Sequence, residues 1–209
     1  MNKRNMELSD KEYVELAEKL DTEQLILEDT QIINNQYENL LKNRIILIND
    51  LISELTIDKV VMPLLQMDND GSNKKITIYI NTNGGSVNDG LVLCDVIERL
   101  KCPTDVIVLG YAYSMGSIIL MAGKNNPNVT RYCYPFSTAL IHGGSAYVSG
   151  TSSQVKDYFK FNEKYEKRIS DFIVSHTNLS EDDYAAIERY EAYLDSDEMY
   201  EKGLVDAIL

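Results

Sequence analysis

The chain has 209 residues, and its 33 acidic against 20 basic side chains give a formal net charge of −13 at pH 7. This length suits one α/β domain with a small appendage, whereas the negative charge disfavours nucleic acids and membranes as partners. No apolar run approaches the roughly 20 residues that cross a bilayer, no signal peptide is indicated, and the three cysteines are typical of reduced thiols in the cytoplasm.

The first residues are expected to form an N-terminal extension, residues 1–30, ahead of a single domain over residues 31–209. Within the extension, Ser9 and Glu12 make a capping-box pattern in front of an apolar helical face, which predicts a short amphipathic helix. The sequence leaves open whether this segment packs on the domain, contacts a partner or is removed.

From about residue 40, strand-like and helix-like patterns alternate. Strands are predicted over residues 44–49, 75–82 and 104–111, with helices over 51–67 and 86–100 between them. This alternation favours an α/β fold of βαβ units, in which parallel strands are joined by right-handed crossovers.

The rest of the chain is predicted to be mostly helical. A helix beginning near Ser114 leads into two short strands over residues 131–135 and 138–142. A long apolar stripe from Val155 to Ile173 then indicates an extended helix, and shorter helices follow it.

Two glycine-containing loops follow predicted strands, where parallel α/β sheets usually carry their binding sites. The first, "NTNGGSV", holds Gly84 and Gly85. Its glycine spacing fits neither the dinucleotide fingerprint nor a phosphate-binding loop, so an ordinary strand-to-helix turn is the plain alternative.

The second loop, "GYAYSMG", places Ser114 where a strand turns into a helix. A helix-capping serine is the plain alternative at such a position. As a nucleophile, this serine would project toward the loop side of the sheet. The free amides of the first helical turn and of the Gly-Gly loop could there bind a negatively charged oxygen.

A nucleophilic serine needs a base, and the chain has only two histidines. His142 ends a predicted strand beside an open Gly-Gly loop, whereas His176 is expected inside a helix. His142 is therefore the candidate base. A histidine-rich metal site is excluded, and no cofactor is expected.

Taken in order, five segments resemble the proteolytic subunit of the Clp protease. They cover the chain from about residue 35 to its end and read "LLKNRIILI", "IYINTNGGSVNDG", "GYAYSMGSIILMAG", "RYCYPFSTALIHG" and "EKGLVDAIL". The resemblance implies the Clp protease/crotonase fold, with repeated βαβ units, a protruding long handle helix and C-terminal helices. It also implies a serine endopeptidase.

Carried over by motif, the resemblance makes Ser114 the nucleophile and His142 the base, with the amides of Gly85 and Met115 as the oxyanion hole. The family's catalytic aspartate falls on Glu191, and the nearby Asp195 remains the alternative third member of the triad.

The resemblance further implies a homo-oligomeric ring that encloses a chamber, with two stacked heptamers as one form. Peptides or unfolded proteins would be the substrates, and an ATP-driven AAA+ unfoldase would be the partner. Residues 151–176 resemble the handle through which two rings interlock. The chain departs from the family pattern at Tyr113, at Gly143 and Gly144, and at Tyr190, which replaces an arginine that couples rings in many relatives.

Two other functions remain open from the sequence. A ring subunit that lost tight triad geometry through Glu191 would act as a scaffold or regulator. A crotonase-type enzyme would share the fold, but it is disfavoured because Ser114 and His142 occupy peptidase-like settings and no coenzyme A site is evident.

Overall fold

The computed structural model describes residues 19, 31–145 and 147–209. The predicted extension over residues 1–30, apart from Lys19, lies outside the described residues, and its boundary stays a prediction. The chain divides into two compact units, Met1–Asn43 and Arg44–Leu209. In the first unit residues 31–42 are helical. The second unit contains the sheet and the helices described below.

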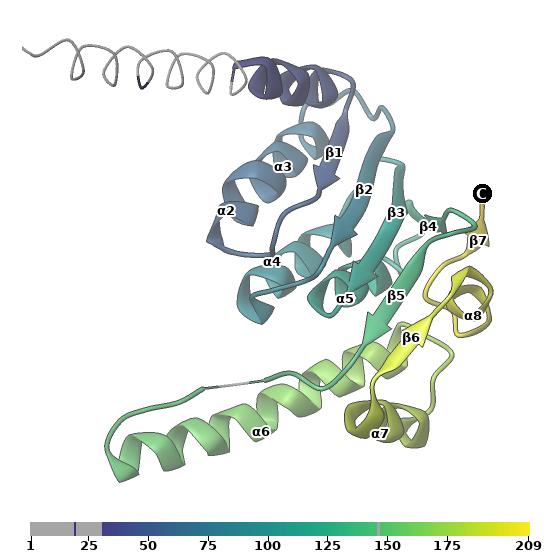
Figure 1. The fold of residues 1–209 in the computed structure, drawn as a ribbon. Coiled ribbons are helices and arrows are strands. Elements are labelled where there is room, and N and C mark those ends of the chain that lie inside the picture. Colours follow the sequence, from purple (N-terminus) through teal and green to yellow (C-terminus); the bar gives the residue numbers. More distant parts are fainter. Residues whose placement is uncertain (1–18, 20–30, 146) are drawn as a thin grey trace, which may run out of the picture. The chain divides into compact units, whose positions relative to one another are not determined.

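A parallel sheet forms the centre of the second unit (Figure 1). Its strands follow the order β1 (Ile45–Ile48), β2 (Ile76–Thr82), β3 (Thr104–Tyr113), β4 (Val129–Cys133) and β7 (Ala207–Ile208), and all four pairings are parallel. The α/β prediction is therefore confirmed, as are the strands predicted near these positions.

Beyond the point where β4 ends, β3 pairs with a different strand. Its first half lies beside β4, whereas Tyr111 to Tyr113 pair in parallel with β5 (Thr138–Ile141). A short strand, β6 (Ala192–Leu194), then adds to β5 in antiparallel orientation. Neither β6 nor β7 was predicted, because strands of three and two residues carry no detectable periodicity.

In the second unit the helices occur where they were predicted, with shifted ends, whereas the helix over residues 31–42 of the first unit was not predicted. The first predicted helix is a run of α2 (Glu54–Thr56), a π-helical turn η1 (Ile57–Val61) and α3 (Met62–Asp68). The others are α4 (Val87–Ile97), α5 (Met115–Met121), α6 (Ser152–Ser175), α7 (Glu181–Tyr190) and α8 (Ser196–Glu201). The 24-residue α6 extends away from the sheet beyond the carboxyl ends of the strands (Figure 1).

One face of the sheet is buried more deeply than the other. Along β2, Ile76, Ile78 and Ile80 are fully buried and alternate with partly exposed residues such as Tyr79. The same alternation runs through β1 and β4. Parallel sheets are usually covered on both faces, whereas the described residues leave this second face partly exposed.

A buried arginine joins the chain end to the sheet. Arg131 of β4 has a fully buried side chain, and it donates hydrogen bonds to Asp206 Oδ1 (2.6 Å) and Oδ2 (3.1 Å) and to the Gly203 carbonyl (3.1 Å). Burial would raise the pKa of Asp206, but the hydrogen bonds and charge of Arg131 hold that pKa below its usual value.

Replacing Asp206 by alanine should strongly destabilise the fold, because Arg131 would keep its charge in the core without a carboxylate to balance it. We expect the free energy of unfolding to fall by roughly 3 to 5 kcal/mol, measured by chemical denaturation at pH 7. Because the folded pKa of Asp206 is lowered, its contribution is present above the ordinary pKa of 3.8. It should disappear as the pH falls through the lowered value.

The exposed pair of Lys167 and Asp171, whose atoms lie 3.0 Å apart, provides the matched comparison. Lys167→Ala should lower the free energy of unfolding far less than Asp206→Ala does, because its ion pair is exposed to solvent. Equal losses in the two variants would contradict the special role given to Arg131 and Asp206.

Candidate active site

Ser114 lies between β3 and α5 in a strained backbone conformation. Its φ of 52° and ψ of −121° are uncommon for a residue with a side chain. The surrounding backbone holds it there: the Ser114 N–H donates to the Leu140 carbonyl (2.9 Å), and the Ser117 hydroxyl donates to the Ser114 carbonyl (2.7 Å). The Ser114 side chain makes no capping hydrogen bond, so the helix-capping alternative is wrong.

Gly84 allows the neighbouring loop to approach this turn. A Cβ atom at position 84 would lie 2.6 Å from the Tyr113 carbonyl oxygen and 2.8 Å from the Met115 nitrogen, and the φ of Gly84 is +90°. Only glycine accommodates both the contact and the conformation. The Gly-Gly loop is therefore more than an ordinary turn, because it packs directly on the serine turn.

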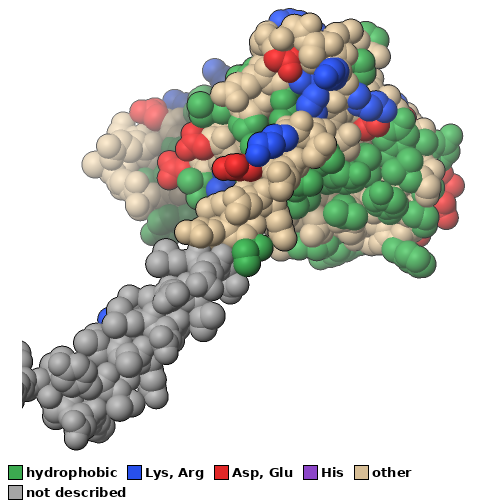
Figure 2. Space-filling view, turned by 90° about the horizontal axis from the view of Figure 1, so that it is seen from above, with side chains coloured by type: hydrophobic (Ala, Val, Ile, Leu, Met, Phe, Trp, Pro, Cys, Tyr) green, Lys and Arg blue, Asp and Glu red, His purple; other side chains and the backbone are tan. Residues whose placement is uncertain are grey.

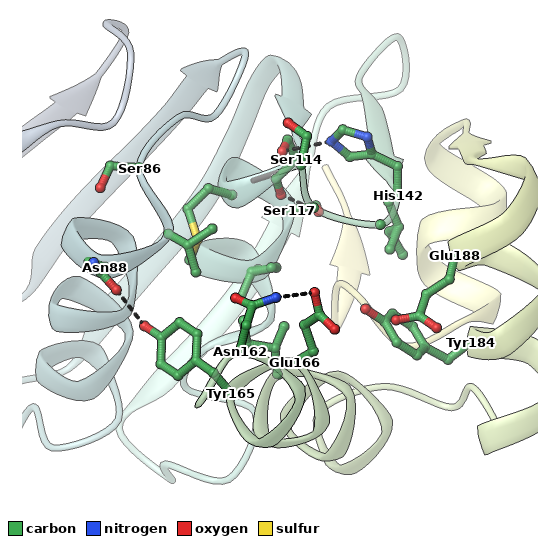
Figure 3. Close-up of a pocket in the computed structure, with 18 of the residues that line it drawn as sticks. Ser86, Asn88, Ser114, Ser117, His142, Asn162, Tyr165, Glu166, Tyr184 and Glu188 are labelled. Carbon is green, nitrogen blue, oxygen red and sulfur yellow. Dashed lines mark hydrogen bonds between the residues drawn. The ribbon is translucent and has the colours of Figure 1, made fainter. Parts of the chain in front are cut away.

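His142 reaches Ser114 because their strands are neighbours. It follows β5 directly, and β5 pairs with the last residues of β3 in the register Tyr113 to Leu140. The Nε2 atom of His142 lies 2.8 Å from Ser114 Oγ, which is hydrogen-bonding distance (Figure 3). The side chain of His142 is 29% exposed, so the pair opens to solvent.

Glu191 lies on the other side of the imidazole. Its Oε1 atom is 3.6 Å from His142 Nδ1, which is within the range of an ion pair but longer than a hydrogen bond. Glu191 follows α7 with a φ of 59° and precedes β6, whose Ala192 pairs with Ile141. The antiparallel pairing of β6 with β5 thus puts Glu191 beside His142.

Asp195 is the N-cap of a helix, α8. Its Oδ1 atom accepts a hydrogen bond from the Glu198 amide at 2.9 Å. Its carboxylate is therefore engaged in holding a helix end, whereas the Glu191 carboxylate faces the imidazole.

Met115 lines the pocket beside Ser114, and Gly85 follows Gly84, which packs on the serine turn. Met115 is the first residue of α5, where an amide has no acceptor inside the helix. In the Gly-Gly loop, the Ile52 amide donates a hydrogen bond to the Gly84 carbonyl, and the Ile52 carbonyl accepts one from the Ser86 amide, both at 2.8 Å. Within the described residues, the amides of Gly85 and Met115 donate no hydrogen bond.

A pocket of about 490 Å³ opens beside Ser114 and His142. Its walls come from α5, α6 and α7, and they carry the carboxylates of Glu166 and Glu188 (Figure 3). Neither acid was predicted from the sequence. On a helix of an acidic chain, such residues cannot be told from a solvated face by their pattern alone.

His176 is not inside a helix as predicted but forms the C-cap of α6. It is buried, and it makes hydrogen bonds to Glu98 and to the Phe172 carbonyl. Its ring is thus engaged in packing α6 against α4.

Other reactive groups have no comparable setting. Cys94, Cys102 and Cys133 are free and buried, and burial raises the pKa of each thiol. Across residues 31–145 and 147–209, no cluster of side chains offers a metal site. No helix in the described part of the chain is long and apolar enough to cross a membrane.

Gly84→Ala should disturb the site more than an alanine at another left-handed glycine. Gly71 is the matched control, because its φ is +76° and a Cβ there would meet no atom within 4 Å. Both variants carry the cost of a left-handed alanine, about 1 to 2 kcal/mol, but only Gly84→Ala must also displace the serine turn.

We therefore expect Gly84→Ala alone to slow the labelling of Ser114 by a fluorophosphonate, by at least about tenfold, and to lower the melting temperature further than Gly71→Ala does. Equal labelling of the two variants would contradict the close approach at Gly84.

Comparison with known proteins agrees with the resemblance read from the motifs. The sequence model of the Clp protease family matches residues 28–209. The ATP-dependent Clp protease proteolytic subunit of Deinococcus radiodurans is 31% identical over 173 residues, which are 83% of either chain. The protein of that name from Carsonella ruddii is 34% identical over 144 residues, 69% of this chain and 72% of its own. The chain belongs to the Clp protease family of serine-type endopeptidases.

Proposed function

We propose that this protein cleaves peptide bonds through an acyl-enzyme formed at Ser114, with His142 as general base and Glu191 as the acid that orients it. The observation that carries the proposal is the 2.8 Å separation of His142 Nε2 and Ser114 Oγ. A serine hydroxyl is a weak nucleophile until a base within hydrogen-bonding distance takes its proton.

The reaction proceeds in two halves. Ser114 Oγ attacks the carbonyl carbon of the substrate while its proton passes to His142 Nε2. The amides of Gly85 and Met115 stabilise the negative oxygen of the tetrahedral intermediate. His142 then gives its proton to the leaving amine, and water hydrolyses the acyl-enzyme by the same path in reverse order.

Glu191 keeps the proton of neutral His142 on Nδ1, so that Nε2 is free to accept. The 3.6 Å separation supports this role, since a small side-chain rotation converts it to a hydrogen bond. Glutamate has one methylene more than the family's aspartate. The left-handed backbone at Glu191 positions this longer side chain against the ring. Asp195 is the weaker candidate because it caps α8.

A homo-oligomeric ring is supported by the hydrophobic surface that the chain leaves exposed. Hydrophobic side chains gather over a broad area of the face drawn in Figure 2, next to Lys and Arg side chains. Among the exposed hydrophobic residues, Phe136 is 97% exposed, and Leu109 belongs to β3 itself. Exposed apolar area of this kind marks an interaction surface.

Stacking of two heptamers through α6 extends this proposal. On α6, Phe159 and Phe161 are both exposed, as a handle that packs on a partner copy requires. Tyr190 stands where many relatives have an arginine that couples rings, so this contact would differ here. The names of the relatives contain "ATP-dependent", which supports an AAA+ unfoldase as partner. ATP would then bind the unfoldase, which would deliver unfolded polypeptides.

The alternative of an inactive ring subunit is not favoured. A chain that had lost catalysis would have no need to keep a strained serine within 2.8 Å of an imidazole.

Ser114→Ala should abolish peptide hydrolysis, because no other hydroxyl lies against His142 Nε2 in the described structure. We expect turnover of a fluorogenic peptide to fall by about 10⁶-fold, to the detection limit, with the oligomer unchanged in size-exclusion chromatography. The unmodified protein should bind a fluorophosphonate at Ser114 alone, as found by mass spectrometry. Residual activity equal to that of the parent protein would refute this assignment of the nucleophile.

Glu191→Ala should lower kcat by roughly 10³- to 10⁴-fold, since the imidazole would lose the group that orients it. Asp195→Asn keeps an N-cap and should leave kcat within about twofold. Steady-state kinetics on one peptide compare kcat of the two variants, and their melting temperatures show whether either variant is less stable. If Asp195→Asn slows turnover and Glu191→Ala does not, the acid is Asp195.

A further inference from the structure

The pocket beside Ser114 has an apolar part and an acidic part. Met115 and Ile118 of α5 line one side, and Tyr165 and Ile169 of α6 line another. Tyr165 is fixed by its hydroxyl, which donates to Asn88 Oδ1 at 2.8 Å and so ties α6 to the start of α4 (Figure 3). These side chains form a channel of the kind that accepts an aliphatic chain.

The acidic part is made by Glu166 of α6 and Glu188 of α7. Apart from His142, they are the only titratable groups other than tyrosines among the residues that line the pocket. The Glu166 carboxylate is held in place, because Asn162 Nδ2 donates to its Oε1 atom at 2.6 Å. Figure 3 shows Glu188 near the hydroxyl of Tyr184, at the end of the pocket formed by α7.

Among the residues that the structure describes, no basic side chain forms an ion pair with either of these carboxylates. The adjacent Lys167 pairs with Asp171 at 3.0 Å instead. The buried phenol of Tyr184 responds to both acids: burial chiefly, then the charge of Glu188 and that of Glu166, raise its pKa to about 12. This end of the pocket is therefore electronegative.

We propose that this pocket binds the side chain on the acyl side of the scissile bond and that Glu166 and Glu188 select lysine or arginine there. The inference rests on the proposed peptidase function and names the substrate class of the same site. A long basic side chain matches both parts of the pocket: its methylene stem packs on Ile118 and Ile169, and its charged head reaches the carboxylates.

Side chains other than lysine and arginine match at most one part of the pocket. Leucine or norleucine would fill the apolar channel but leave the carboxylates without a partner, and glutamate would be repelled. A single exposed ion pair contributes only a small preference. Both Glu166 and Glu188 are exposed, and two such carboxylates acting together correspond to a preference of roughly tenfold.

The test compares peptides that are identical except at the residue before the scissile bond, which is lysine, norleucine or glutamate. Norleucine keeps the lysine stem and removes only the ammonium group. We expect kcat/KM for the lysine peptide to exceed that for the norleucine peptide by about tenfold at low ionic strength. The Glu166→Gln/Glu188→Gln double variant should bring this ratio to about one. Glu163→Gln, an exposed position on α6 outside the pocket lining, should leave the ratio unchanged.

A binding measurement makes the test independent of catalysis. In the Ser114→Ala variant, fluorescence anisotropy should find that a product peptide ending in lysine binds about tenfold more tightly than its norleucine counterpart. Adding the two glutamine substitutions should remove that difference. A lysine-to-norleucine ratio of one or less, in both cleavage and binding, would overturn the assignment of the pocket.

The two proposals fail in different ways. If Ser114 reacts with a fluorophosphonate and the norleucine peptide is cleaved without any preference for lysine, the pocket assignment fails and the peptidase function stands. If no peptide is cleaved and Ser114 is not labelled, the peptidase function fails, and the binding measurement still decides the pocket.

Discussion

The pairing of β3 with β5 is the constraint on which the site depends. β3 is ten residues long and changes neighbours along its length, from β4 to β5. Because β5 lies beside the last residues of β3, the strand that ends in His142 finishes next to the turn that holds Ser114. Two residues 28 positions apart thereby come within hydrogen-bonding distance. The amide of Ser114 bonds to the Leu140 carbonyl, so the same pairing also holds the strained serine in place.

The other groups of the site lie on either side of Ser114 and His142. On one side the Gly-Gly loop packs against the serine turn so closely that a Cβ atom on Gly84 would clash with it. On the other side β6 extends β5 in the antiparallel direction, and the left-handed residue that links α7 to β6 is Glu191. Each element contributes one group: a hydroxyl, an imidazole, a carboxylate or an amide. The site is thus built by sheet edges and turns around a rigid core, which is where strained and polar groups can be supported.

Charge is distributed unevenly around this framework. Where an ion pair secures the fold, as between Arg131 and Asp206, the arginine is fully buried and its hydrogen-bonding groups are engaged. In the pocket beside Ser114, by contrast, Glu166 and Glu188 have no basic partner within the described chain, and a cation from outside would complete them. The second face of the sheet also lacks a partner within the described chain. In a ring, other copies of the chain would cover its apolar residues.

The sequence by itself determined the order of the longer strands and helices of the second unit, because the alternation of buried residues is a local pattern of period two or 3.6. It also singled out Ser114 and His142, since a serine between glycines at a strand end and one of only two histidines leave few other choices. Only the tertiary structure decided which acid faces the imidazole, that β6 and β7 exist, and that Glu166 and Glu188 line a pocket. The physical reason is that these features arise from contacts between segments far apart in the chain. A carboxylate among 33 acids looks the same in sequence whether water or an active site surrounds it.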